Sequence, residues 1–431
     1  MGFLEERRKA EEERRLADPT SADIGFLDDN DTLNLYAESV DAGHKVDSRA
    51  QKVFVLAVVL VVLVVFAMLV PKGMFDPGLL MSMNMAAHSD YWTVSWFATQ
   101  FSENMQTFIL LFVGNADSVS DFVHYFVIAL AGAGLALTGA VYQGAFRNAL
   151  VSPSTLGVMT GGSFGMMLWV LVITESGGTL SLAAIDYTRS GLSWMDYLSS
   201  SYGMAAMSFL GCFAVVALVL LTMRLAGGQT SGIMMIITGQ VIGSVIGVFT
   251  TLVTYYYATT DPYGDAAQFL QEVAVATFIR EFTWVDVVAI GVPLIITFMV
   301  VMRIRQKMML LALDKTEQRT LGVNTRRMNF AVVSLCTLLT SIIISFCGTV
   351  GFVGFLVPHL ARRLVGPNFK YLLPASLLLG SVFVLGAYVL LEATLGVDYA
   401  QMVGMFISIG GAAIFLVTAL RGKGVSYGSF K

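Results

Sequence analysis

The sequence predicts an all-α polytopic membrane protein with about ten transmembrane helices. Of its 431 residues, 56% are hydrophobic and only 13% are charged, and the mean hydropathy is +0.73. A soluble domain is typically about a quarter charged. The stretch from Val53 to Val70 contains no charge and is long enough to cross a hydrocarbon layer of about 30 Å as a helix. A chain of this composition requires lipid as its solvent.

Apolar runs between charged or Pro/Gly-marked breaks define the predicted spans. They are 52–70, 121–142, 154–174, 204–225, 232–257, 284–304, 328–347, 351–366, 371–391 and 402–420. The run 351–366 is short, contains Pro358 and ends in charge, so we expect a broken or partly re-entrant helix there. The first run is preceded by many charged residues and lacks a cleavage pattern, which disfavours a signal peptide.

An even number of spans places both termini on one side, and the Lys and Arg residues predict which side. Placing the N-terminus in the cytoplasm leaves only Lys72, Arg189 and Arg280 outside. The inner loops and span ends then carry Arg147, Arg224, Arg303, Arg305, Lys307, Lys315, Arg319, Arg326, Arg327, Arg362, Arg363, Lys370, Arg421 and Lys423. This asymmetry predicts a multi-pass membrane protein with both termini in the cytoplasm.

The predicted domain organisation has three parts. Residues 1–50 form a charged cytoplasmic extension, partly helical or disordered, which acts either as a soluble tail or as a docking element. Residues 51–421 form the transmembrane domain and include a cytoplasmic segment, 306–327, and residues 422–431 form a cytoplasmic tail. The methionines and His88 of the outer segment 72–120 could ligate a soft metal, but its aromatic residues favour an interfacial loop or helix, so no metal site is predicted.

The sequence lacks the common nucleotide-binding and catalytic motifs. It has no G-x-x-x-x-G-K-[ST] phosphate loop, no G-x-S-x-G elbow and no H-E-x-x-H pair. Cys212, Cys336 and Cys347 lie in apolar runs without metal-binding spacing. The predicted spans hold almost no carboxylates for ion coupling. We therefore expect a transport subunit that is not an enzyme, binds no cofactor or nucleic acid, and takes its energy from a partner.

Three segments carry a resemblance to a known family. The block LAGAGLALTGAVYQGAFRNALVSPSTLGVMTGGSFG, Leu130–Gly165, and the block GFVGFLVPHLARRLVGPNFKYLLPASLLLG, Gly351–Gly380, resemble signatures of the FecCD/BtuC family of ABC-importer permeases. Between them, LALDKTEQRTLGV, Leu311–Val323, is similar to the family's coupling segment. The resemblance implies a BtuC-like, type II importer fold in a bacterial cytoplasmic membrane and a cargo such as a ferric siderophore, haem or cobalamin.

The resemblance also implies partners. Two permease subunits, identical or paralogous, would enclose a path, two ABC ATPase subunits would bind ATP and Mg²⁺, and an extracytoplasmic binding protein would deliver the ligand. The implied ATPase-coupling residues are Leu313, Asp314, Lys315, Thr316, Glu317, Gln318, Arg319, Leu321, Gly322 and Val323. An ordinary basic inner loop is the simpler alternative for this segment.

The predicted span 232–257 resembles the family helix that lines the path at the dimer interface. Its candidate path-lining residues are Thr238, Gln240, Ser244, Thr250, Thr251 and Thr254. The same hydroxyls could instead bond the carbonyls one turn earlier in their own helix. Gly239, Gly243 and Gly247 recur every fourth residue, a spacing that permits close helix packing.

The outer face departs from the family pattern. Asp121, His124 and Glu392 stand where relatives carry arginines that dock the binding protein, and acidic residues outnumber basic ones on this predicted face. Either a basic partner or cationic ligand complements the reversed charge, or docking uses other contacts. A secondary transporter and a membrane receptor or assembly scaffold are the alternative functions.

Overall fold

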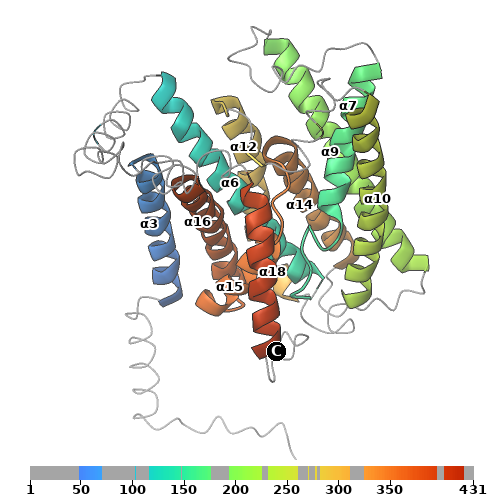
Figure 1. Cartoon of the computed structure of the whole chain (residues 1–431). Coiled ribbons are helices and arrows are strands. Elements are labelled where there is room, and N and C mark those ends of the chain that lie inside the picture. The colour runs from blue at the N-terminus through green and yellow to red at the C-terminus, as the bar shows by residue number, and fades with distance from the viewer. Residues whose placement is uncertain are drawn as a thin grey trace, which may run out of the picture. The chain divides into compact units, whose positions relative to one another are not determined.

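The computed structural model of the chain is all-helical in the part that it describes, residues 48–69, 102, 116–146, 148–175, 194–225, 232–260, 270, 277–278, 282–310, 325–395 and 402–421. Ten helices follow one another (Figure 1): α3 (Ser48–Leu69), α6 (Ala116–Ala145), α7 (Val158–Glu175), α9 (Trp194–Leu225), α10 (Gly232–Thr260), α12 (Trp284–Leu310), α14 (Thr325–Cys347), α15 (Val353–Val365), α16 (Phe369–Leu395) and α18 (Val403–Arg421).

Each predicted span corresponds to one of these helices, which confirms the predicted fold class. Seven of the helices are long and apolar enough to cross a membrane, while α7 and α18 have shorter apolar stretches, Val158–Val172 and Val403–Ala413. The helix α15 is only 13 residues long, about 20 Å at 1.5 Å per residue, and contains Pro358. The run 351–366 thus holds a short helix that is continuous through Pro358, and its partly re-entrant placement stays a prediction.

Helix α6 forms the centre of the compact unit Lys52–Lys431 (Figure 1). It contacts α12, α14, α15 and α16, and 89% of its apolar window is buried, against 11% for α10. Small residues allow this position, because a Cβ at Gly132 would overlap the carbonyl of Gly380, and one at Gly139 would overlap the backbone of Gly354. Backbones approach this closely only where side chains are absent.

Helices that follow one another along the chain alternate in direction (Figure 1). Gly132 of α6 meets Gly380 of α16, and Ser381 donates to the carbonyl of Ala129 at 2.8 Å, so α6 and α16 are antiparallel. In α14, Thr337 pairs with Tyr142 at 2.7 Å and Ile343 lies against Gly134, which makes α14 antiparallel to α6 as well. The N-terminal ends of α3, α7, α10, α14 and α16 therefore lie at the same end of the bundle as the C-terminal ends of α6, α9, α12, α15 and α18.

Irregular backbone separates α14 from α15. Phe352 has φ 61° and precedes the first turn of α15, where the amides of Phe355 and Leu356 both donate to its carbonyl. Its side chain lies against Gly411 of α18, and its ring meets that of Phe355 edge-on at 6.2 Å. A phenylalanine in the left-handed region is rare, and here the packing against α18 compensates for its strain.

Candidate functional site

One side of α10 packs against the rest of the bundle. A Cβ at Gly239 would lie 2.8 Å from the backbone of Leu156, and one at Gly243 would lie 3.0 Å from Oγ1 of Thr160. These two glycines thus allow α10 to approach α7, whereas Gly247 has nothing within 4 Å of the position of a Cβ. The close-packing interpretation of the glycine repeat holds for two of its three members.

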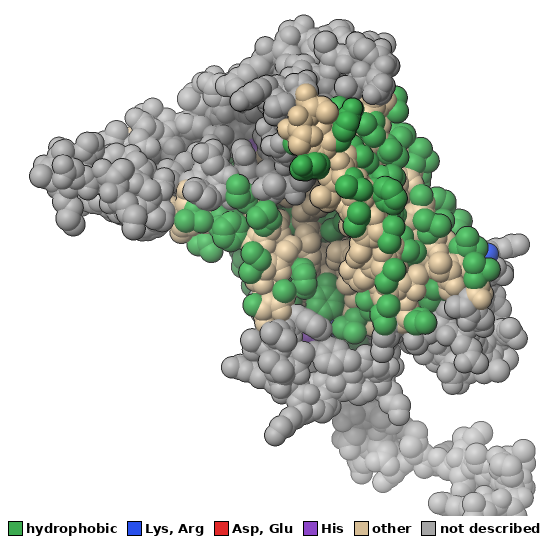
Figure 2. Space-filling view, turned by 45° about the vertical axis from the view of Figure 1, so that its right-hand side comes forward, with side chains coloured by type: hydrophobic (Ala, Val, Ile, Leu, Met, Phe, Trp, Pro, Cys, Tyr) green, Lys and Arg blue, Asp and Glu red, His purple; other side chains and the backbone are tan. Residues whose placement is uncertain are grey.

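The other side of α10 is not covered by the part of the chain that the structure describes. The large side chains that are more than half exposed on it are Met234, Ile237, Val241, Val245, Val248, Phe249, Leu252, Tyr255 and Tyr256. Figure 2 shows hydrophobic side chains over the face that comes forward on this side of the molecule. Exposed apolar side chains in such a continuous set indicate contact with lipid or with another protein.

The polar candidates on α10 mostly bond within their own helix. The hydroxyls of Thr238, Ser244, Thr250, Thr251 and Thr254 donate to carbonyls one turn earlier, at 2.8–3.1 Å. Gln240 differs, because its Nε2 donates to the carbonyl of Thr155 at 3.4 Å. These bonds to the backbone use the hydroxyl protons but leave the hydroxyl oxygens able to accept. The geometry is therefore compatible both with lining of a path and with bonding within the helix alone.

Three of these candidates share the uncovered face. Gln240, Ser244 and Thr251 are exposed, while Thr238, Thr250 and Thr254 are half-buried. Residues 240, 244, 251 and 255 follow the spacing of one helical stripe, so the exposed polar groups are aligned along the helix and end at Tyr255. We call Gln240, Ser244, Thr251 and Tyr255 the α10 stripe.

The residues at the predicted docking positions have different environments. Glu392 is only 5% exposed, and its Oε2 accepts a hydrogen bond from the phenol of Tyr125 at 2.9 Å. His124 is half-buried, with Nε2 3.0 Å from the hydroxyl of Tyr388 and its ring 5.2 Å from that of Phe282. Asp121 lies on α6, but its side chain is outside the described residues. Two of the three positions therefore face inward, between α6 and α16.

No sequence pattern predicted these inward hydrogen bonds. Tyr125 and Tyr388 look like ordinary aromatic residues near span ends, but both are buried and both bond a polar residue of the facing helix. The rings of His124, Tyr125, Phe282 and Tyr388 and the carboxylate of Glu392 form one cluster. The ring of Phe278 joins it, 6.2 Å from that of Tyr388. A pairing of this kind can be recognised only when the register between α6 and α16 is known.

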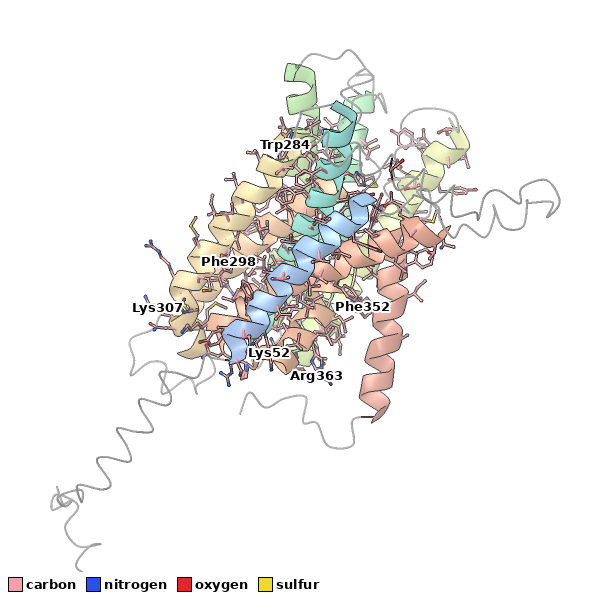
Figure 3. The ribbon with its side chains drawn as sticks, turned by 90° about the vertical axis from the view of Figure 1, so that its left-hand side faces the viewer. Lys52, Trp284, Phe298, Lys307, Phe352 and Arg363 are labelled. Carbon is pink, nitrogen blue, oxygen red and sulfur yellow. The ribbon has the colours of Figure 1, made fainter. Side chains whose placement is uncertain are left out.

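Charge is divided between the two ends of the bundle. Every described Asp or Glu lies at one end: Asp117, Asp121, Glu175, Asp196, Asp286 and Glu392. Every described Lys or Arg in Lys52–Lys431 lies at the other: Lys52, Arg224, Arg303, Arg305, Lys307, Arg326, Arg327, Arg362, Arg363, Lys370 and Arg421. Figure 3 shows Lys52, Lys307 and Arg363 at the lower end and Trp284 at the upper end. We call these the basic and the acidic end.

The predicted coupling residues, Leu313 to Val323, lie outside the described residues, as do residues 1–47 and 422–431. The helices that flank the coupling segment are described. The C-terminus of α12 and the N-terminus of α14 both lie at the basic end, and these two helices contact each other. The segment between them therefore begins and ends at the basic end.

Within the described residues, ten helices of alternating direction, one of them half-length, and a division of charge between the ends indicate a membrane-embedded, multi-pass protein. The FecCD transport family model matches residues 91–421, and the chain belongs to this family. The family consists of permease subunits of ABC importers.

Individual relatives agree with this assignment. The chain is 30% identical over 254 residues to the molybdate import system permease protein MolB of Haemophilus influenzae, covering 59% of this chain and 66% of MolB. It is 29% identical over 256 residues to the Fe(3+)-citrate import system permease protein YfmE of Bacillus subtilis, covering 59% and 67%. A solved chain described as an inward-facing, metal-chelate type ABC transporter matches with a TM-score of 0.60 at 23% identity, over 86% of this chain and 99% of that one. The last match supports the fold.

Proposed function

We propose that this chain is the permease subunit of an ATP-driven importer whose cargo is an iron chelate, haem or a corrinoid-type ligand. The observation that carries the proposal is the uncovered face of α10 with its polar stripe, in a member of the FecCD family. A second permease subunit would cover this face, and the α10 stripe would then line the path between the two subunits. A path lined by hydroxyls and an amide suits a large polar ligand that must not be held tightly.

Energy for transport would enter at the basic end. A separate ABC ATPase subunit, which holds ATP and Mg²⁺, would dock on the segment between α12 and α14 and drive alternating access. Leu313, Asp314, Lys315, Thr316, Glu317, Gln318, Arg319, Leu321, Gly322 and Val323 are the proposed contacts. This end would face the cytoplasm, because the described cations concentrate there and positive charge is retained inside.

Delivery would occur at the acidic end, from an extracytoplasmic binding protein. The names of relatives include permeases for molybdate and for Fe(3+)-citrate, and these cargoes differ in size and charge. An iron chelate is our first choice because YfmE carries one and the fold matches a metal-chelate type transporter.

The test combines partner capture with uptake. The full chain is expressed with its candidate ATPase, and uptake of labelled ferric citrate, a ferric siderophore, haem and cobalamin is measured. Leu321→Asp and Gly322→Trp should each abolish ATPase co-purification and reduce uptake more than tenfold, because they would disrupt the proposed docking contact. Arg224→Gln, which removes a charge from the same end on α9, serves as the control and should keep both activities.

Two other outcomes would each indicate a different function. Uptake that continues without any ATPase, and that depends on a proton or sodium gradient, would replace this proposal with secondary transport. Stable partner binding without uptake of any ligand would instead indicate a receptor or scaffold.

A further inference from the structure

Exposed cations from three helices lie at the basic end, where Lys52 of α3 adjoins Arg363 of α15 and Lys370 follows shortly after on α16. Lys52 of α3 donates from Nζ to the carbonyl of Leu364 at 2.8 Å, directly after Arg363 near the end of α15. The connection from α15 to α16 is short, and Asn368 caps α16 through its Oδ1, which accepts from the amide of Lys370 at 2.9 Å. Figure 3 shows Lys52 and Arg363 beside each other. We call Lys52, Arg363 and Lys370 the α3–α15 cation cluster.

No described carboxylate neutralises this cluster. Every described Asp or Glu lies at the acidic end, about the length of a spanning helix away. The Lys370 ammonium lies 5.1 Å from the ring centroid of Tyr371, and the N-terminus of α16 adds its own positive partial charge. Charges separated by more than about 10 Å are largely screened at moderate salt, so the carboxylates of the acidic end do not neutralise the α3–α15 cation cluster. The local potential set by the described residues is positive.

Apolar side chains lie directly beside the same cations. Leu364, next to Arg363, is 42% exposed, and Val55, one turn after Lys52 on α3, is 52% exposed. The other exposed apolar side chains of α3 are Phe54, Val58, Val59, Val61, Val62 and Phe66. A site for a soluble anion does not require a hydrocarbon surface at its edge. A cation group above an apolar helix matches a molecule with a phosphate at one end and acyl chains at the other.

We propose that the α3–α15 cation cluster binds the headgroup phosphate of an anionic phospholipid in the cytoplasmic leaflet, with the acyl chains along the exposed face of α3. Within the described residues, α3 meets the core only through a stripe that includes Leu56, Leu60 and Leu63. The lipid would bridge α3 to α15 and α16 and hold the first helix against the bundle. This site does not depend on the cargo or on the ATPase.

The experiment uses the full chain, purified in a neutral detergent and titrated with phosphatidylglycerol, with bound lipid counted by native mass spectrometry. Phosphatidylcholine, which carries its own cation, is the lipid control, and glycerol 1-phosphate is the headgroup without chains. Lys52→Gln, Arg363→Gln and Lys370→Gln should each weaken phosphatidylglycerol binding about fivefold, from roughly 1 kcal/mol per cation near a membrane surface. The matched control removes three cations of the same end on α12, through Arg303→Gln, Arg305→Gln and Lys307→Gln together.

The proposal stands if the cluster variants lose phosphatidylglycerol while the α12 triple variant keeps it. It is overturned if both sets lose lipid equally, since that result means a general surface potential. Displacement of the lipid by glycerol 1-phosphate at equal concentration would also overturn it, since that result means a soluble phosphate site. Increased lipid binding after deletion of residues 1–47 would overturn it as well, since that result means that the acidic extension occupies the cluster. Lys370→Gln alone decides the matter if the other variants fail to fold, because Lys370 is exposed and its capping bond uses only the backbone amide.

Discussion

The phenol of Tyr125 donates a hydrogen bond of 2.9 Å to Oε2 of Glu392 and so joins α6 to α16 across a buried contact. Glu392 occupies a position where the family resemblance implies an exposed docking group. In this chain the carboxylate is 5% exposed and bonded within the protein. A buried carboxylate that loses its donor is costly, which gives this contact a structural consequence that can be measured.

Tyr125→Phe removes this donor while keeping the ring. We expect a loss of about 1–3 kcal/mol in the free energy of unfolding, because the carboxylate stays buried with one bond fewer. Thermal unfolding of the detergent-solubilised chain measures the change. Tyr371→Phe, at a half-buried tyrosine near the basic end, is the control and should stay within about 0.5 kcal/mol of the parent. An unchanged melting temperature for Tyr125→Phe would show that the bond contributes nothing to stability.

Gly139→Ala tests the contact between α6 and α15. A Cβ at this position overlaps the backbone of Gly354, so we expect destabilisation of about 1–3 kcal/mol from overpacking. Gly247→Ala on α10 makes the same chemical change where nothing lies within 4 Å of the new methyl. It should be neutral or stabilise the helix by up to about 1 kcal/mol. Equal melting temperatures for the two variants would contradict the described packing.

Val248→Cys tests whether a second permease subunit covers α10. Val248 is 58% exposed on the uncovered face, and the native cysteines Cys212, Cys336 and Cys347 are all buried, so background labelling should be low. We expect a crosslinked dimer on oxidation in native membranes. Val219→Cys, at a position 2% exposed on α9, should give none. A homodimer band means two copies of this chain, and a band with another permease means a paralogue. Labelling of Val248→Cys by a lipid-soluble maleimide with no crosslink would mean that lipid covers this face.

Asp121→Arg tests the reversed charge at the acidic end. If docking relies on a basic surface of the binding protein, this variant should slow association about tenfold at low salt, with a smaller effect at high salt. Surface plasmon resonance of the permease in nanodiscs measures the rate. Glu175→Arg changes the same charge at the same end on α7 and should have a weaker effect if Asp121 lies in the contact. Faster association with Asp121→Arg would mean that the docking surface of the binding protein is acidic and does not complement the negative charge of Asp121.

Hydropathy was sufficient to locate the helices, because the cost of placing charge in hydrocarbon constrains every span. It did not locate their ends. Helix α9 begins at Trp194, whereas the predicted span begins at 204, and α6 begins at Ala116 rather than 121. The additional turns contain Asp, Ser and Tyr, which tolerate a helix but do not raise hydropathy. Pro358 and the following arginines indicated that α15 is short, since those residues are costly inside a full span.

Tertiary register was not available from the sequence. Whether Glu392 points outward or toward Tyr125 depends on the rotation of α16 against α6. The close backbone approach of Gly132 to Gly380 determines that rotation. The conformation of Phe352 depends in the same way on Gly411 of α18. For α10 the sequence identified the polar residues but did not predict which of them lie on the uncovered face. Gln240, Ser244 and Thr251 were separated from Thr238, Thr250 and Thr254 only by their exposure.

The separation of charge between the acidic and basic ends also limits how two copies can be arranged. With the basic end in the cytoplasm, as proposed above, inverting the bundle would carry its described cations through the bilayer and against the membrane potential, at roughly 2.3 kcal/mol per charge for each 100 mV. Under that proposal all copies insert in one direction. Two copies that meet through α10 must then be related by a twofold axis along the membrane normal, with every α10 residue near that axis facing its own counterpart.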